Sequence, residues 1–142
     1  MPELRELIGR AKEIYPQAYP KCRWKEQEKL FEFPSGARIE FGYCDNVDDA
    51  ERYRGQEYTW LGIDEISQYA TDEILEKLSR SVRTTDLELK CYIRATTNPS
   101  GAGVLWVKKR WIDRAKSDVP CFETWNTALG DITISRKWIH ST

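Results

Sequence analysis

Residue types that build metal centres and covalent frameworks are scarce in this chain. It has one histidine, His140, and its four cysteines show no C-x-x-C spacing. Structural zinc sites need close Cys and His pairs, so we expect neither a zinc site nor a disulfide framework, but free thiols in a reducing compartment. No apolar run approaches the roughly 18 residues of a membrane span, and the N-terminus lacks the apolar core of a signal peptide.

The phosphate-binding sequence G-x-x-x-x-G-K-[ST] is also absent, because no glycine of the chain is followed by lysine. That loop normally cradles phosphates with its backbone N–H groups and its lysine. A strong charge bias is absent as well, since 22 Lys and Arg balance 23 Asp and Glu. The chain therefore lacks the basic footprint of a dedicated DNA-binding domain. Its 142 residues are enough for one domain with a core, and we expect a single domain over residues 1–142.

Two apolar runs that end in polar residues are the strongest positive signal. Residues 58–63 lead into Asp64 and Glu65, and residues 89–96 lead into Thr97 and Asn98. Both runs are typical of buried parallel strands, whose C-terminal ends bind ligands in open α/β sheets. Helix and strand alternate from residue 58 onward, which predicts a mainly parallel sheet with flanking helices.

The remaining elements follow from periodicity. Apolar residues at helical spacing predict a helix over residues 3–15, which the prolines at 16 and 20 end. Alternation on either side of a Pro-Ser-Gly turn predicts a β-hairpin over residues 29–41. Further predictions are a loop with one helical turn over 43–57, a helix capped by Thr71, a helix over 104–115, a strand over 120–125 and a loop over 126–142.

The residues at the two strand ends suit phosphate chemistry. Asp64 can hold Mg²⁺ through its water shell, and Glu65 can polarise an attacking water as a general base. Thr96, Thr97 and Asn98 offer hydroxyl and amide groups that can touch a γ-phosphate oxygen. The alternatives are an exposed acidic turn for the carboxylates and ordinary turn chemistry before Pro99 for the second group.

Two basic features have weaker functional readings. Arg54 can stabilise charge on a neighbouring subunit's nucleotide as an arginine finger, or it can be a solvated loop residue paired with a nearby acid. Lys108, Lys109 and Arg110 can track a DNA phosphate backbone, but a solvated helix face is the simpler explanation.

Four blocks of the sequence carry a resemblance to a known family. They are residues 31–42, 53–65, 95–99 and 103–112, in this order and spacing. Together they resemble the ATPase half of the large terminase subunit of tailed bacteriophages, which drives DNA into preformed capsids. The resemblance implies an incomplete P-loop NTPase-type three-layer fold with a β-hairpin insertion, and activity in the cytoplasm of the bacterial host.

The same resemblance implies roles, cofactors and partners. Asp64 would be the Walker B ligand of Mg²⁺, Glu65 the catalytic carboxylate, and Arg54 the arginine finger, with Mg-ATP as the nucleotide. Residues 96–98 would form the motif that couples hydrolysis to DNA movement. The implied partners are double-stranded viral DNA, the portal protein, the small terminase subunit and further copies in a ring.

The chain departs from the family pattern at both ends. We expect the Walker A loop to precede residue 1 and a nuclease domain to follow residue 142, so that the chain alone binds ATP very weakly. Two rivals stay open: another nucleic-acid motor of the same sheet type, such as a helicase, and a catalytically inactive remnant that acts as a binding or assembly module.

Overall fold

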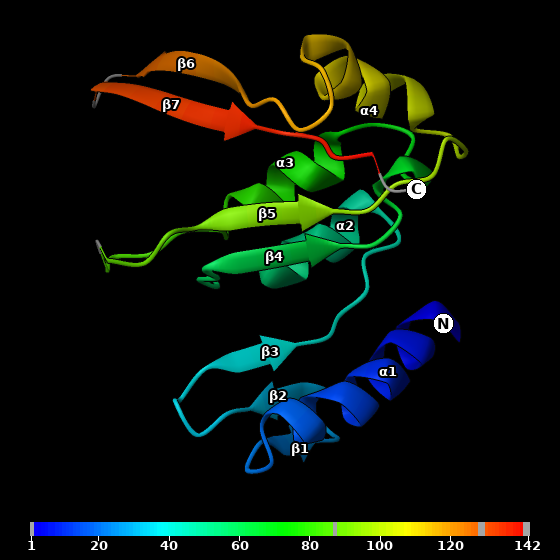
Figure 1. Cartoon of the computed structure of the whole chain (residues 1–142), viewed down its shortest axis with the longest axis vertical. Helices are drawn as coiled ribbons and strands as arrows, with labels where there is room; N and C mark the ends of the chain where they lie inside the picture. The colour runs from blue at the N-terminus through cyan, green and yellow to red at the C-terminus, as the bar shows by residue number, and fades with distance from the viewer. Residues whose placement is uncertain (1, 87, 128–129, 141–142) are drawn as a thin grey trace. The chain divides into compact units, whose positions relative to one another are not determined.

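The chain is a mixed α/β protein made of two compact units. A computed structural model describes residues 2–86, 88–127 and 130–140. Contacts divide the chain into Met1–Asp45 and Asn46–Thr142, and Figure 1 colours it along its length. The expectation of a single domain over 1–142 stays a prediction. None of the helices in the described ranges has the length and apolarity that a membrane span needs.

The N-terminal unit is one helix and one small antiparallel sheet. Helix α1 covers Pro2–Ala18, and strands β1 (Arg23–Lys25), β2 (Leu30–Glu32) and β3 (Arg38–Glu40) pair in the order β1-β2-β3. The predicted helix and hairpin are confirmed. The helix runs through Pro16 instead of stopping there, since a proline near a helix end removes only one of its hydrogen bonds. Strand β1 was not predicted, because its connection to β2, residues 26–29, has no Gly, Pro, Asn or Asp to mark a turn.

Aromatic side chains form the core of this unit. Phe31 is 1% exposed and is buried together with Ala11 and Phe41. The Tyr15 ring meets the Phe31 ring edge-on with centroids 5.1 Å apart, and the Trp24 ring lies 4.9 Å from it. Edge-to-face aromatic pairs add to the free energy of area burial, so Phe31 is the centre of the packing here.

The second unit contains the predicted parallel pair. Strands β4 (Trp60–Ile63) and β5 (Tyr92–Ala95) are parallel, with Ile63 opposite Ala95. The prediction that they are buried is wrong for most positions: Ile63 is 8% exposed, but Trp60 is 43% and Tyr92 is 49% exposed. In the described part of the chain this sheet has only two strands, so each strand has an open edge.

Short helices flank this pair in sequence. They are α2 (Val47–Ala50), the 3-10 turns η1 (Glu51–Tyr53) and η2 (Ile66–Gln68), and α3 (Glu73–Ser79). Helix α3 has a buried apolar face made of Ile74, Leu75 and Leu78. The predicted Thr71 cap is wrong: the residue before the helix is Asp72, whose side chain makes no capping bond.

The C-terminal part differs most from expectation. Helix α4 covers Val104–Arg110 and gives way to the turn η3 (Ile112–Arg114), so it is shorter than the predicted helix. Strand β6 (Cys121–Thr127) pairs antiparallel with β7 (Gly130–Arg136) and does not join the parallel pair. The predicted loop over 126–142 is therefore wrong where β7 lies; residues 128–129 and 141–142 of it are outside the described ranges. Alternation of Ile132 and Ile134 with Thr133 and Ser135 was the overlooked strand signal.

Candidate active site

The polar residues that follow β4 and β5 lie next to one another. The two strands run in the same direction, as Figure 1 shows, so their C-terminal ends meet at one edge. Backbone hydrogen bonds continue the pairing past the strands: the Thr96 N–H donates to the Ile63 carbonyl at 2.9 Å, and the Ile66 N–H donates to the Thr96 carbonyl at 2.9 Å. This arrangement brings Asp64 and Glu65 to residues 96–98, where the ligand sites of parallel sheets form.

Thr96 connects both carboxylate residues through one hydroxyl group. Its Oγ1 donates to Asp64 Oδ1 and accepts a hydrogen bond from the Glu65 N–H at 2.9 Å. A hydroxyl has one donor and two acceptor positions, so both contacts can form at the same time. Thr96 therefore fixes the Asp64 side chain and the Glu65 backbone together.

Glu65 has an unusual backbone conformation. Its φ of 48° and ψ of 52° lie in the left-handed region, which a non-glycine residue enters at a cost of about 1–3 kcal/mol. The bond from its N–H to Thr96 and the turn η2 that begins after it hold this conformation. The bend directs the chain away from β4 directly after Asp64, so that consecutive carboxylates belong to one site.

Both carboxylate oxygens of Glu65 are held by amide groups. Oε1 accepts a hydrogen bond from Asn98 Nδ2 at 2.9 Å, and Oε2 accepts one from Gln68 Nε2. Sequence reasoning missed Gln68; its signal is the spacing of three residues from Glu65, which one 3-10 turn brings to the same side. The two amides restrict the Glu65 side chain to one orientation.

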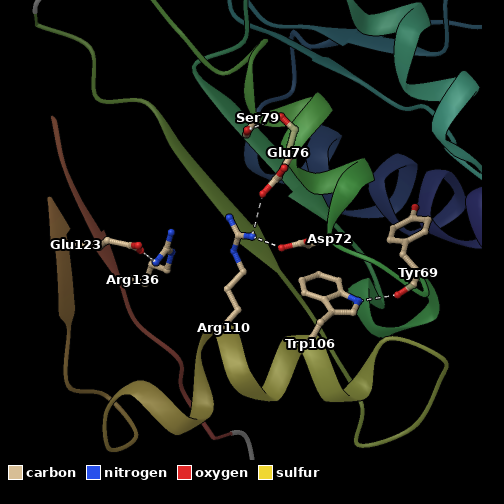
Figure 2. Close-up of polar contacts among 8 residues, drawn as sticks. All are labelled: Tyr69, Asp72, Glu76, Ser79, Trp106, Arg110, Glu123 and Arg136. Carbon is tan, nitrogen blue, oxygen red and sulfur yellow. Dashed lines mark hydrogen bonds and ion pairs between the residues drawn. The ribbon is translucent and has the colours of Figure 1, made fainter. Parts of the chain in front are cut away.

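The loop that carries Asn98 is packed closely on η2. Ser67 is 2% exposed; its Oγ donates to the Asn98 carbonyl at 3.2 Å, and its own carbonyl accepts from the Gly103 N–H at 2.8 Å. One turn along α4, Trp106 Nε1 donates to the Tyr69 carbonyl at 2.8 Å (Figure 2). These bonds position the loop and, through it, the amide that meets Glu65.

Gly103→Ala is expected to lower the free energy of unfolding by about 1–3 kcal/mol, because a Cβ there has no room. It would lie 2.0 Å from the Tyr69 carbonyl oxygen and 2.4 Å from Trp106 Nε1. A backbone carbonyl cannot rotate away as a side chain can, so α4 must shift. Urea unfolding measures the effect. The control is Gly9→Ala in α1, where a Cβ meets nothing within 4 Å and a gain of up to about 1 kcal/mol is expected. Equal effects at both positions would contradict the packing argument.

Thr97 and Arg54 do not touch the carboxylates in the described contacts. The Thr97 hydroxyl bonds to the Asn98 carbonyl at 3.2 Å. Arg54 follows η1, its side chain is 86% exposed, and it lies 3.7 Å from Glu51. Its pairing partner is therefore a nearby acid of η1, and its exposure leaves it open to groups outside the chain.

Two of the three basic residues of α4 form ion pairs with neighbouring carboxylates. Arg110, whose side chain is 20% exposed, reaches α3, where it pairs with Asp72 and lies 3.6 Å from Glu76 (Figure 2). Lys108 pairs with Asp113, whereas Lys109 is exposed with no ion pair among the described residues. The Arg110 charge thus ties α4 to the start of α3.

The donor set at Asp64 fits a hard cation. Asp64 is exposed, Oδ1 bonds to Thr96, and the neighbouring groups offer oxygen, which Mg²⁺ prefers. Across the described ranges no group of three or more His, Cys, Asp and Glu could enclose an ion. Magnesium commonly binds through one or two carboxylates and completes its shell with water and phosphate oxygens, so the residues present suit it.

Comparison with known proteins gives one family. The family model described as terminase large subunit, T4-like virus type, N-terminal, matches residues 11–130, which is most of the chain. No curated protein and no solved structure matches the chain.

Proposed function

The chain belongs to the terminase large subunit family, and from this membership we propose that it is part of a motor that couples Mg-ATP hydrolysis to the movement of viral double-stranded DNA into a procapsid. The observation that carries the proposal is the contact between the two strand ends. Asp64 bonds to Thr96, and Glu65 bonds to Asn98. A metal-binding carboxylate, and a general base in contact with a phosphate-sensing amide at the same sheet edge, are the parts that phosphoryl transfer to water needs.

Each residue has one task in this proposal. Asp64, oriented by Thr96, holds Mg²⁺, and the ion when bound neutralises charge on the phosphates. Glu65 orients the attacking water and accepts its proton. Asn98 and Gln68 keep the Glu65 carboxylate in the position from which it can do so, since each occupies one of its oxygens.

Residues 96–98 are proposed as the coupling motif. Asn98 contacts the catalytic carboxylate with its side chain, and its backbone carbonyl bonds to Ser67 in η2. The loop continues directly into α4 through Gly103. A change at the phosphate that alters the Asn98 contact would therefore be transmitted to the α4 helix. Its Lys108 and Lys109 are proposed to face DNA, whereas Arg110 is held against α3.

Further parts are proposed from family membership. A segment outside these 142 residues supplies the Walker A loop and completes a three-layer P-loop fold. Arg54 acts as an arginine finger on an adjacent subunit of a ring, which its 86% exposed side chain permits. Portal protein and small terminase subunit are the protein partners, and the site of action is the cytoplasm of the bacterial host.

One sequence observation favours a second function for the chain alone. Because no glycine is followed by lysine, it has no Walker A lysine to hold phosphates. The chain by itself would then be an inactive binding or assembly module. A helicase, the other motor considered, has no observation in its favour.

Calorimetric titration with a non-hydrolysable ATP analogue and Mg²⁺ tests the motor proposal. Two forms are compared: the chain of 142 residues and the same chain extended at its N-terminus from the source genome. Binding by the extended form alone is expected, since the phosphates need the loop. Binding by neither form would contradict the motor and favour the inactive module. Binding by the short chain would refute the requirement for a Walker A loop.

A further inference from the structure

A basic hollow lies in the second unit, and of the candidate site residues only Arg54 is in its lining. It has a volume of about 450 Å³. Its lining comes from the α2–η1 segment and from α3 with the residues that follow it, two segments that lie side by side in Figure 1. The charged residues that line it are four cations and one acid: Arg54, Lys77, Arg80, Arg83 and Glu51.

Hydrogen bonds hold the two walls of the hollow together. Ser81 is 6% exposed, and its Oγ donates to the Tyr53 carbonyl at 2.8 Å. The backbone of Tyr58 bonds on both sides of Val82, from its N–H to the Ser81 carbonyl at 2.8 Å and from its carbonyl to the Arg83 N–H at 3.0 Å. These hydrogen bonds join the backbone segment that carries Arg54 to the segment that carries Arg83. The cations of the hollow therefore project from two segments that are held together.

The acids nearby neutralise only part of this positive charge. Glu51 bonds to Lys77 at 2.9 Å and lies 3.7 Å from Arg54, and Glu57, outside the lining, lies 3.3 Å from Arg83. Lys77, with smaller contributions from Arg54 and Arg80, lowers the pKa of the Glu51 carboxyl below its usual value. Four cations and one lining acid leave a formal charge of +3. Arg80 is exposed and has no ion pair among the described residues.

A purely structural explanation accounts for only some of these cations. Lys77 and Arg80 stand at the C-terminal end of α3, where positive charge is favoured by the helix dipole. Arg54 and Arg83 are not in that helix, yet they line the same hollow with side chains 86% and 55% exposed. Four cations share only two acids here, Glu51 and Glu57, and exposed guanidinium groups that outnumber their acids are suited to an oxyanion.

We propose that this hollow binds a multiply charged phosphate anion, namely a polyphosphate chain or the phosphate backbone of a nucleic acid. A single carboxylate would neutralise one of the excess charges, whereas linked phosphates neutralise several in the same volume. Guanidinium groups also bind phosphate oxygens in pairs, which gives geometric selectivity. Binding here requires neither Mg²⁺ nor hydrolysis, so it can be tested separately from the motor function.

The test uses two probes without Mg²⁺, inorganic tripolyphosphate by calorimetry and a short DNA duplex by fluorescence anisotropy. The variant Arg80→Gln with Arg83→Gln is expected to weaken binding at least about tenfold, and to reduce the salt slope for the duplex by about 2 because two phosphate contacts are lost. If tripolyphosphate binds, a compact polyphosphate is sufficient to occupy the hollow. Binding of the duplex alone identifies an extended backbone. Either result, with loss in the variant, supports the site.

Three controls separate the site from general electrostatics and from a structural role. The double variant Arg5→Gln with Arg10→Gln in α1 lowers the net charge by the same amount as the variant of the hollow does. It should leave binding of both probes unchanged. Glu51→Gln removes the competing carboxylate and should tighten binding several-fold, a gain that misfolding cannot produce. A hexaglutamate peptide should bind more weakly than tripolyphosphate. Absence of binding by both probes, equal loss in the α1 variant, or equal binding of the peptide would each overturn the proposal.

Discussion

Glu65→Gln is expected to lower the rate of ATP hydrolysis by about 10²–10⁴-fold while Mg-ATP binding persists, in a chain extended to carry the phosphate-binding loop. The amide has nearly the shape of the carboxylate, but it cannot accept a proton from the attacking water. Asp64 and Thr96 are untouched by the change, so the proposed metal ligand keeps its hydrogen bond.

The structure gives a second reason for a large effect. Both oxygens of the Glu65 carboxylate accept hydrogen bonds from amide N–H groups, from Asn98 on one side and Gln68 on the other. A glutamine can accept only at its single oxygen, so one of the two neighbouring amides must turn its own oxygen toward the new NH₂ group or lose its contact. The pair of contacts that orients the side chain is therefore changed as the proposed base is removed.

Single-turnover hydrolysis and analogue binding, measured on the same preparations, distinguish these effects from a loss of nucleotide affinity. Glu73→Gln is the matched control, because Glu73 is an exposed carboxylate in the first turn of α3 and no contact of the site involves it. Its hydrolysis rate should be unchanged. If Glu65→Gln hydrolyses ATP as fast as this control does, Glu65 is not the base.

Phe31→Ala is expected to reduce the free energy of unfolding of the N-terminal unit by about 3–5 kcal/mol. Phe31 is 1% exposed, and the rings of Tyr15, Trp24, Phe33 and Phe41 all lie within 6.3 Å of its centroid. Truncation removes the one side chain that all four share. Their own aromatic contacts restrict how far they can collapse into the space, which places the loss at the upper end for core truncations.

Native-state hydrogen exchange of the amides in β2 and β3 measures this loss within the unit itself. Phe122→Ala is the matched control, since Phe122 in β6 is 69% exposed and the same atoms are removed from a surface position. It should change the exchange free energy of those amides by less than about 0.5 kcal/mol. If Phe31→Ala lowers the exchange free energy of these amides no more than Phe122→Ala does, the aromatic cluster does not stabilise the hairpin.

Local sequence signals predicted the elements whose patterns were complete. The apolar spacing of α1, the Pro-Ser-Gly turn between β2 and β3, and the runs that became β4 and β5 all correspond to elements of the expected type. The overlooked strand β7 also had a local signal, the alternation after Gly130. Burial was predicted poorly for β4 and β5, because burial depends on which strands pair beside them, and periodicity does not report that.

By itself the sequence determined which residues end the two parallel strands, and therefore that Asp64, Glu65, Thr96 and Asn98 share one edge of a sheet. It also determined that no Walker A sequence lies in the chain. Only the tertiary structure decided which atoms meet: the left-handed turn at Glu65, the amide of Gln68 on its second oxygen, and the gathering of Arg54, Arg80 and Arg83 around one hollow. Strand ends follow from local periodicity, whereas contacts between residues 30 positions apart depend on how loops close and pack, which no local pattern encodes.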